Sequence, residues 1–114
     1  MFTYEAKVLR VVDGDTIDAL IDLGFDIHKK IRIRMVGMNA PESRTRDLEE
    51  KKRGLAAKAR LKEILKEHKN KFILESQGVG KYGRCLGIIN IDGKSVNQQL
   101  ITEGHAVEYF GGKR

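Results

Sequence analysis

The chain has 114 residues with 22 Lys or Arg and 16 Asp or Glu, so its formal net charge is +6 at pH 7. This length is that of one domain, and we expect a single domain over residues 1–114. One cysteine excludes an internal disulfide framework, and the three histidines lack the spacing of a zinc site. No apolar run approaches the roughly 18 residues that cross a membrane, so we expect no membrane partner.

The basic residues are unevenly distributed. Eleven of the 22 lie between Arg44 and Lys71, which favours a polyanionic partner such as nucleic acid because neutralised phosphates release counterions. The alternative is a solvated helix face on which basic residues alternate with Glu. The N-terminal residues lack the core of a signal peptide, so a cytoplasmic location is the default expectation, and a secreted mature fragment is the alternative.

Three strands are predicted in the first third of the chain. Residues 4–12 and 17–23 alternate apolar and polar side chains as half-buried strands do, and Asp13-Gly14 between them is a strong hairpin signal. Residues 29–36 form the third strand, with isoleucines on one face and arginines on the other.

A helix is predicted over residues 47–68, begun by Asp47 with a glutamate in capping-box spacing. Its apolar stripe consists of Ala57, Leu61, Ile64, Leu65 and His68, the last of these interpreted as a helix-end residue. Residues 71–76 and 85–91 read as two further strands. Ser95 then caps a short helix that ends at Gly104.

The order of three strands, a helix, two strands and a helix predicts a mainly β protein. We expect a five-stranded antiparallel barrel of the oligonucleotide-binding kind, the OB-fold, with one helix between strands three and four and a short helix after strand five. A βαβ sheet would alternate strand and helix from the start.

Two Asp-Gly turns differ in the residue that comes after them. Asp92-Gly93 is followed by lysine, whereas Asp13-Gly14 is followed by Asp15, an acid at the entrance to a strand where acids are disfavoured. Turn chemistry alone does not require Asp15. From the residues alone, a turn and a ligand site both remain open.

Oxygen donors follow the third strand closely. If the first three strands form a meander, Asp15 lies near the loop after Arg34, where the Asn39 side chain and the Ala40 carbonyl would complete a set suited to a hard cation such as calcium. Asp and Asn are also common turn formers, which is the alternative interpretation. Together with Glu42 and a second arginine, Arg84, these residues are an inventory for phosphodiester hydrolysis: a cation, charge clamps and a general base.

A second phosphate-binding candidate precedes the fifth strand. The stretch KYGRCLG holds Lys81, Tyr82 and Arg84. Arginine can grip a phosphate with two hydrogen bonds, and a tyrosine can stack on a base or contact a terminal phosphate. Cys85, among apolar neighbours, is expected to be a buried structural thiol.

Four stretches resemble, in order, motifs of the staphylococcal nuclease (thermonuclease) family: VVDGDTI, IRIRMVGMNAPES, KYGRCLGIINIDGKSVNQQLI and EGHAV. The resemblance covers nearly the whole chain, from about residue 5 to residue 110. It implies an OB-fold nuclease domain of this family.

The resemblance also implies a metal site. Asp15 matches the principal calcium-ligating aspartate, and Ala40 stands where a threonine ligates through its backbone carbonyl. Asn39 stands where the family has a second ligating aspartate. Because asparagine keeps an oxygen but loses a charge, we expect one Ca²⁺ ion bound more weakly, or an altered metal preference.

Catalytic and substrate-binding roles follow from the same resemblance. Arg34 and Arg84 match the arginines that clamp the scissile phosphate, and Glu42 matches the general base on the attacking water. The matched substrate-binding residues are Lys81 and Tyr82, which contact the terminal phosphate, and Tyr109 and Phe110, where the family has a base-stacking tyrosine.

The implied activity is calcium-dependent hydrolysis of DNA and RNA, with single strands preferred and 3′-phosphates left. The alternative is a non-catalytic adaptor domain that binds nucleic acid or protein, and a purely structural domain is a third class. Adaptors of this fold tend to lack the acid and arginine set, which favours the nuclease. The chain is expected to be a monomer or a homodimer.

Overall fold

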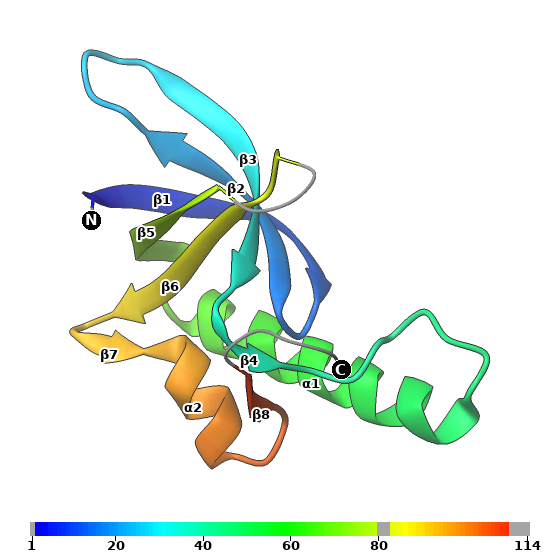
Figure 1. Ribbon diagram of the computed structural model, residues 1–114. Helices are drawn as coiled ribbons and strands as arrows, with labels where there is room; N and C mark the ends of the chain where they lie inside the picture. The colour runs from blue at the N-terminus through cyan, green and yellow to red at the C-terminus, as the bar shows by residue number, and fades with distance from the viewer. Residues whose placement is uncertain (1, 80–82, 110–114) are drawn as a thin grey trace.

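The computed structural model describes residues 2–79 and 83–109 (Figure 1). The elements in chain order are β1 (Phe2–Asp13), β2 (Thr16–Asp22), β3 (His28–Met35), β4 (Gly37–Asn39), α1 (Leu48–Glu67), β5 (Lys71–Val79), β6 (Cys85–Ile91), β7 (Lys94–Ser95), α2 (Val96–Thr102) and β8 (Val107–Tyr109). The five predicted strands and two predicted helices are confirmed. The short strands β4, β7 and β8 were not predicted.

The strands β3-β2-β1-β5-β6 form a closed five-stranded barrel, because β3 also pairs with β6. The predicted OB-fold barrel is therefore confirmed. One detail differs from the expectation of a wholly antiparallel barrel, since β3 and β6 run parallel. A closed ring with an odd number of strands cannot alternate in direction all the way round, so one pair must be parallel.

Beside the barrel, β4 and β8 form a separate two-stranded sheet. Asn39 pairs with Val107, and Gly37 pairs with Tyr109. This pairing brings the C-terminal part of the described chain against the segment that follows β3. Strands of three residues are too short to show a period, which is why neither was predicted from the residue pattern.

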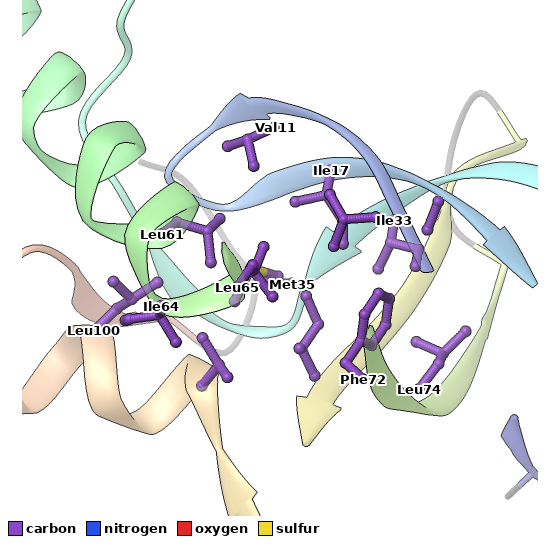
Figure 2. Close-up of a cluster of buried hydrophobic side chains, with 14 of the residues drawn as sticks. Val11, Ile17, Ile33, Met35, Leu61, Ile64, Leu65, Phe72, Leu74 and Leu100 are labelled. Atoms are coloured by element: carbon purple, nitrogen blue, oxygen red, sulfur yellow. The ribbon is translucent and has the colours of Figure 1, made fainter. Parts of the chain in front are cut away.

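Helix α1 covers one end of the barrel (Figure 1), and its buried side chains join the hydrophobic core (Figure 2). Of its predicted stripe, Ala57, Leu61, Ile64 and Leu65 are buried. They pack with the inward side chains of the strands, among them Ile17 and Ile33. The basic side chains of α1 face outward, and Cys85 is buried as expected.

The ends of α1 agree with the sequence in part. Asp47 accepts hydrogen bonds from the backbone N–H groups of Glu49 (3.0 Å) and Glu50 (3.2 Å), so it is the N-cap. The Asp47 N–H donates to Thr45 Oγ1. His68 is an exposed C-cap residue rather than a member of the buried stripe, because its backbone has already left the helical conformation (φ −110°, ψ 27°).

Helix α2 is anchored at both ends and through one buried polar side chain. Ser95 accepts from the Gln98 N–H (3.1 Å), and Gly104 follows the helix with φ +81°. The buried Asn97 amide donates to the Val36 carbonyl (2.8 Å) and accepts from the Ile89 N–H (3.1 Å). Asn97 therefore ties α2 to the segment after β3 and to β6.

In the part of the chain that the structure describes, no helix is long and apolar enough to cross a membrane.

The two helices are joined by a charged cluster. Arg60 on α1 donates to both carboxylate oxygens of Glu103 (2.6 and 3.0 Å), and Gln99 donates to the same carboxylate (2.9 Å). These hydrogen bonds lower the pKa of Glu103 from 4.5 to about 2, and the hydrogen bond from Arg60 has the larger effect. A carboxyl whose folded pKa is depressed stabilises the fold above its unfolded pKa, and the stabilisation is lost as the pH falls through the folded value.

We expect Glu103→Gln to unfold at a lower urea concentration than the unmodified protein at pH 7. The difference should shrink as the pH falls from about 4.5 to about 2, where Glu103 itself takes up a proton. Urea titrations across this pH range would measure it. Glu67→Gln, which removes a carboxylate from α1 outside the cluster, is the matched control. A difference independent of pH would contradict a charge-based clamp.

Candidate functional site

The β1–β2 hairpin places Asp15 in a buried position where its carboxylate is surrounded by donors. Asp15 is 7% exposed. Its Oδ1 accepts from the Thr16 hydroxyl (3.0 Å), and its Oδ2 accepts from the backbone N–H of Ala40 (3.0 Å). The Asp15 carbonyl accepts from the Met35 N–H (2.8 Å). The hairpin is therefore fastened to the end of β3 and to the loop after β4, as the meander predicted.

The two Asp-Gly turns use their glycines for different reasons. Asp92 and Gly93 both have positive φ (52° and 78°), the backbone of a type I′ hairpin turn. In the first hairpin the two turn residues are Gly14 and Asp15, and neither has positive φ. A Cβ on Gly14 would lie 2.7 Å from the Ala57 Cβ of α1, so close packing requires this glycine.

Arg34 binds the oxygens that the sequence assigned to a metal. Its Nη2 donates to the Asn39 side-chain oxygen and lies 3.6 Å from Asp15 Oδ2, while Nη1 donates to the Met35 carbonyl. The Asp15 and Asn39 oxygens thus converge on one positively charged group. A hard cation would find the same two oxygens on one side of the pocket.

A pocket of about 920 Å³ brings most of the predicted site together. Seven of the ten predicted site residues line it: Asp15, Arg34, Asn39, Ala40, Glu42, Arg84 and Tyr109. The other three, Lys81, Tyr82 and Phe110, lie outside the described residues. A second pocket of about 600 Å³, lined by residues of all five barrel strands and of the end of α1, contains none of the seven predicted site residues that the structure describes.

Arg84 brings an unsatisfied donor to this pocket. Its Nε is buried and has no hydrogen-bond partner among the described residues. A buried donor without an acceptor costs about 1–3 kcal/mol. Arg84 also lines the pocket, and guanidinium groups bind phosphate through paired hydrogen bonds.

Asp13 has a role that sequence reasoning missed. It lines the pocket, and its carboxylate accepts from the hydroxyl and the backbone N–H of Ser43, the residue after Glu42. The hairpin signal explained Asp13 completely, so nothing in the sequence indicated this contact. Arg44 and Gln77 also line the pocket and were not predicted.

The loop that carries Glu42 lies directly against α1. A Cβ on Gly54 would lie 2.3 Å from the Glu42 carbonyl oxygen and 2.7 Å from the Ser43 nitrogen. These distances are too short for any side chain, so the helix can approach the loop only where it has a glycine. An isolated glycine inside a predicted helix is the one signal that could have revealed this contact.

The expected metal ligands carry little charge. The described residues contain no cluster of three His, Cys, Asp or Glu side chains suited to a metal. The expected set has only one such residue, Asp15, beside an amide oxygen and a backbone carbonyl. Oxygen ligands of this kind suit calcium, which binds more weakly as the number of ligand charges falls.

Comparison with known proteins identifies the class. The sequence model of the family described as "Staphylococcal nuclease homologue" matches residues 32–114. The chain belongs to this family. The resemblance to this family is thereby confirmed, and three of the four motifs, except for Ile31 at the start of the second, lie within the matched residues.

Individual relatives are similar over nearly the whole chain. The chain is 31% identical to a thermonuclease of Staphylococcus hyicus over 91% of its length, which is 59% of that protein. It is 29% identical to Protein ParB of Escherichia coli over 90% of its length and 56% of that protein. It is 35% identical to Endonuclease YhcR of Bacillus subtilis over 94% of its length, but only 9% of that protein. The chain thus spans little more than half of the first two relatives and a small part of the third.

We expect Gly54→Ala to destabilise the protein, although alanine normally stabilises a helix interior relative to glycine by about 1 kcal/mol. The added methyl group collides with the backbone of the Glu42 loop, so either α1 or the loop must move. Urea unfolding would measure the sign.

Ala59→Gly, at an exposed position of the same helix, is the control and should cost about 1 kcal/mol. A Gly54→Ala protein more stable than the unmodified chain would contradict the close contact.

Proposed function

We propose that this chain is a metal-dependent nuclease that hydrolyses single-stranded DNA and RNA and leaves 3′-phosphates. The observation that carries the proposal is the convergence of two arginines, a buried carboxylate and an exposed glutamate on one pocket. Family membership and the nucleases among its relatives support it.

In this proposal the two arginines bind the phosphate. Arg34 lies at the end of β3, and Arg84 immediately precedes β6, the strand that pairs with β3. Their guanidinium groups neutralise charge that develops on the phosphate oxygens during attack. Fixed charges in a partly dry site stabilise such charge more than water does, because they need no reorganisation.

Glu42 is the proposed general base. It is exposed and lines the same pocket, so water can reach its carboxylate. Its backbone is held by α1 at Gly54 and through Ser43 by Asp13. A base fixed on a rigid support can take the proton from a water aligned with the scissile bond.

Asp15, Asn39 and the Ala40 carbonyl would hold a Ca²⁺ ion. Bound calcium would supply Lewis-acid polarisation of the phosphate. Arg34 now contacts both side-chain oxygens of this set, so it must share them with a cation or turn toward the substrate phosphate. Thr16 and the Ala40 N–H hold the Asp15 carboxylate in place throughout.

The second candidate function is a non-catalytic adaptor that binds nucleic acid. One observation favours it. Arg34 contacts both Asp15 and Asn39, so the charge of the Asp15 carboxylate is compensated without a metal. The adaptor would keep the phosphate-binding arginines and lose the hydrolysis step.

Incubating the chain with single-stranded DNA in calcium, in magnesium and in EDTA separates the two functions. We expect cleavage with calcium and none with EDTA. Glu42→Gln and Arg84→Ala should each lower the cleavage rate on the order of a hundredfold or more, since each removes one group that acts in the transition state.

Circular dichroism would check that both variants keep the fold, and Lys62→Gln on the outer side of α1 is the control for lost charge. Absence of cleavage under every metal would favour the adaptor. Full activity in either variant would rule out the proposed roles.

Asn39→Asp should bind Ca²⁺ more tightly, because it adds a second negative ligand. Isothermal titration calorimetry of both proteins with calcium would measure the change. Equal affinities would show that position 39 is not a metal ligand.

A further inference from the structure

The hairpin between β2 and β3 presents an aromatic side chain at its tip. Phe25 is 98% exposed, and Leu23 and Ile27 on either side of it are exposed as well. The hairpin extends away from both helices (Figure 1). Exposed clusters of large apolar side chains are uncommon on soluble proteins and often mark binding surfaces.

The tip is ordered by hydrogen bonds in a backbone conformation that a bulky residue rarely adopts. Gly24, Phe25 and Asp26 have φ of +82°, +56° and +60°. The Leu23 N–H donates to the Ile27 carbonyl (2.8 Å), and the Ile27 N–H donates to the Gly24 carbonyl (2.9 Å). Non-glycine residues held at positive φ are often found where function uses the strained geometry.

The outer face of the barrel below this tip carries an excess of positive charge. Arg10 pairs with Asp18 across β1 and β2, and Asp18 pairs with Arg32 across β2 and β3. Arg32 donates to both oxygens of Asp18 (2.8 and 3.2 Å). The pKa of Asp18 is lowered, and the largest cause is this hydrogen bond from Arg32. Burial of the carboxylate raises the pKa, whereas the charges of Arg32, Lys30 and Arg10 lower it further. Three cations therefore surround one carboxylate.

This basic face continues into the pocket. Lys30, Arg32 and Arg34 alternate along β3 and so share one face, with roughly 6.6 Å between successive side chains. Arg34 lines the pocket. From Arg34 to His28, the first residue of β3, the strand rise covers roughly 20 Å, and Phe25 lies in the turn beyond it. The row of cations thus leads from the candidate site toward the aromatic tip.

We propose that a single-stranded nucleic acid seated in the pocket continues along the outer face of β1, β2 and β3. Its phosphates bind Arg10, Lys30 and Arg32, and one of its bases stacks on Phe25. This inference deepens the proposed function and rests on it for the strand in the pocket. The ring of Phe25 can stack on any base, so the surface adds affinity without sequence preference.

The test compares the binding of a short and a long strand in EDTA, where no metal-dependent cleavage occurs. Fluorescence anisotropy is measured with a labelled thymidine trimer, which cannot reach the tip, and a thymidine dodecamer. Phe25→Asn removes the ring but keeps a residue that tolerates positive φ. The double variant Arg10→Gln/Lys30→Gln removes two charges and leaves the Asp18–Arg32 pair intact. Lys62→Gln/Lys66→Gln on α1 is the matched control.

Phe25→Asn and Arg10→Gln/Lys30→Gln should each weaken dodecamer binding on the order of tenfold and leave trimer binding unchanged. The double variant should also reduce the slope of log K against log salt by roughly 1.4, as expected for two lost phosphate contacts with a single strand. The control should bind both strands as the unmodified chain does.

Two results would overturn the proposal. One is dodecamer binding that neither variant changes. The other is Phe25-dependent binding to phosphatidylserine vesicles with dodecamer binding unaffected, which would assign the tip to a lipid surface. The proposed nuclease activity is tested independently of this surface. Weakened dodecamer binding in both variants supports the surface even if no metal gives cleavage. If the chain cleaves DNA and both variants bind the dodecamer normally, the proposed surface is wrong and the proposed nuclease activity is retained.

Discussion

The buried charge of Asp15 is the constraint around which the candidate site is arranged. A carboxylate removed from water must be compensated by hydrogen bonds or opposite charge. Here the compensation comes from three separate places: a hydroxyl next in the chain, a backbone N–H of the loop after β4, and the guanidinium of Arg34. Satisfying one charge therefore fixes the hairpin, the end of β3 and the site loop relative to each other.

Two glycines complete this arrangement from the side of the helix. Gly14 allows the hairpin to approach α1 and the loop, and Gly54 allows α1 to approach the backbone at Glu42. Both contacts are governed by steric exclusion, whereas Asp15 acts through charge. The helix between β3 and β5 is thus a support for the site as well as a cover for the core.

The sequence was sufficient to predict the barrel and to bring most of the candidate site residues to one pocket, because each strand has a clear period and a meander must bring Asp15 near the loop after Arg34. Three features could not be predicted. The strands β4 and β8 are too short for a pattern. The burial of the Arg84 Nε depends on packing from distant segments. The exposure of Phe25 depends on how far its hairpin extends, since LGFDI alone reads only as a turn.

The odd number of strands has a mechanical consequence. The parallel seam that closes the barrel pairs only residues 33–35 with residues 85–87, and it is the shortest ladder in the ring. The segments carrying Arg34 and Arg84 meet across this seam. Ile33 and Met35 of this seam are fully buried in the core, so opening it would expose core side chains to water. The separation of the two arginines is therefore tied to the packing of the core, although both side chains line a pocket on its outside.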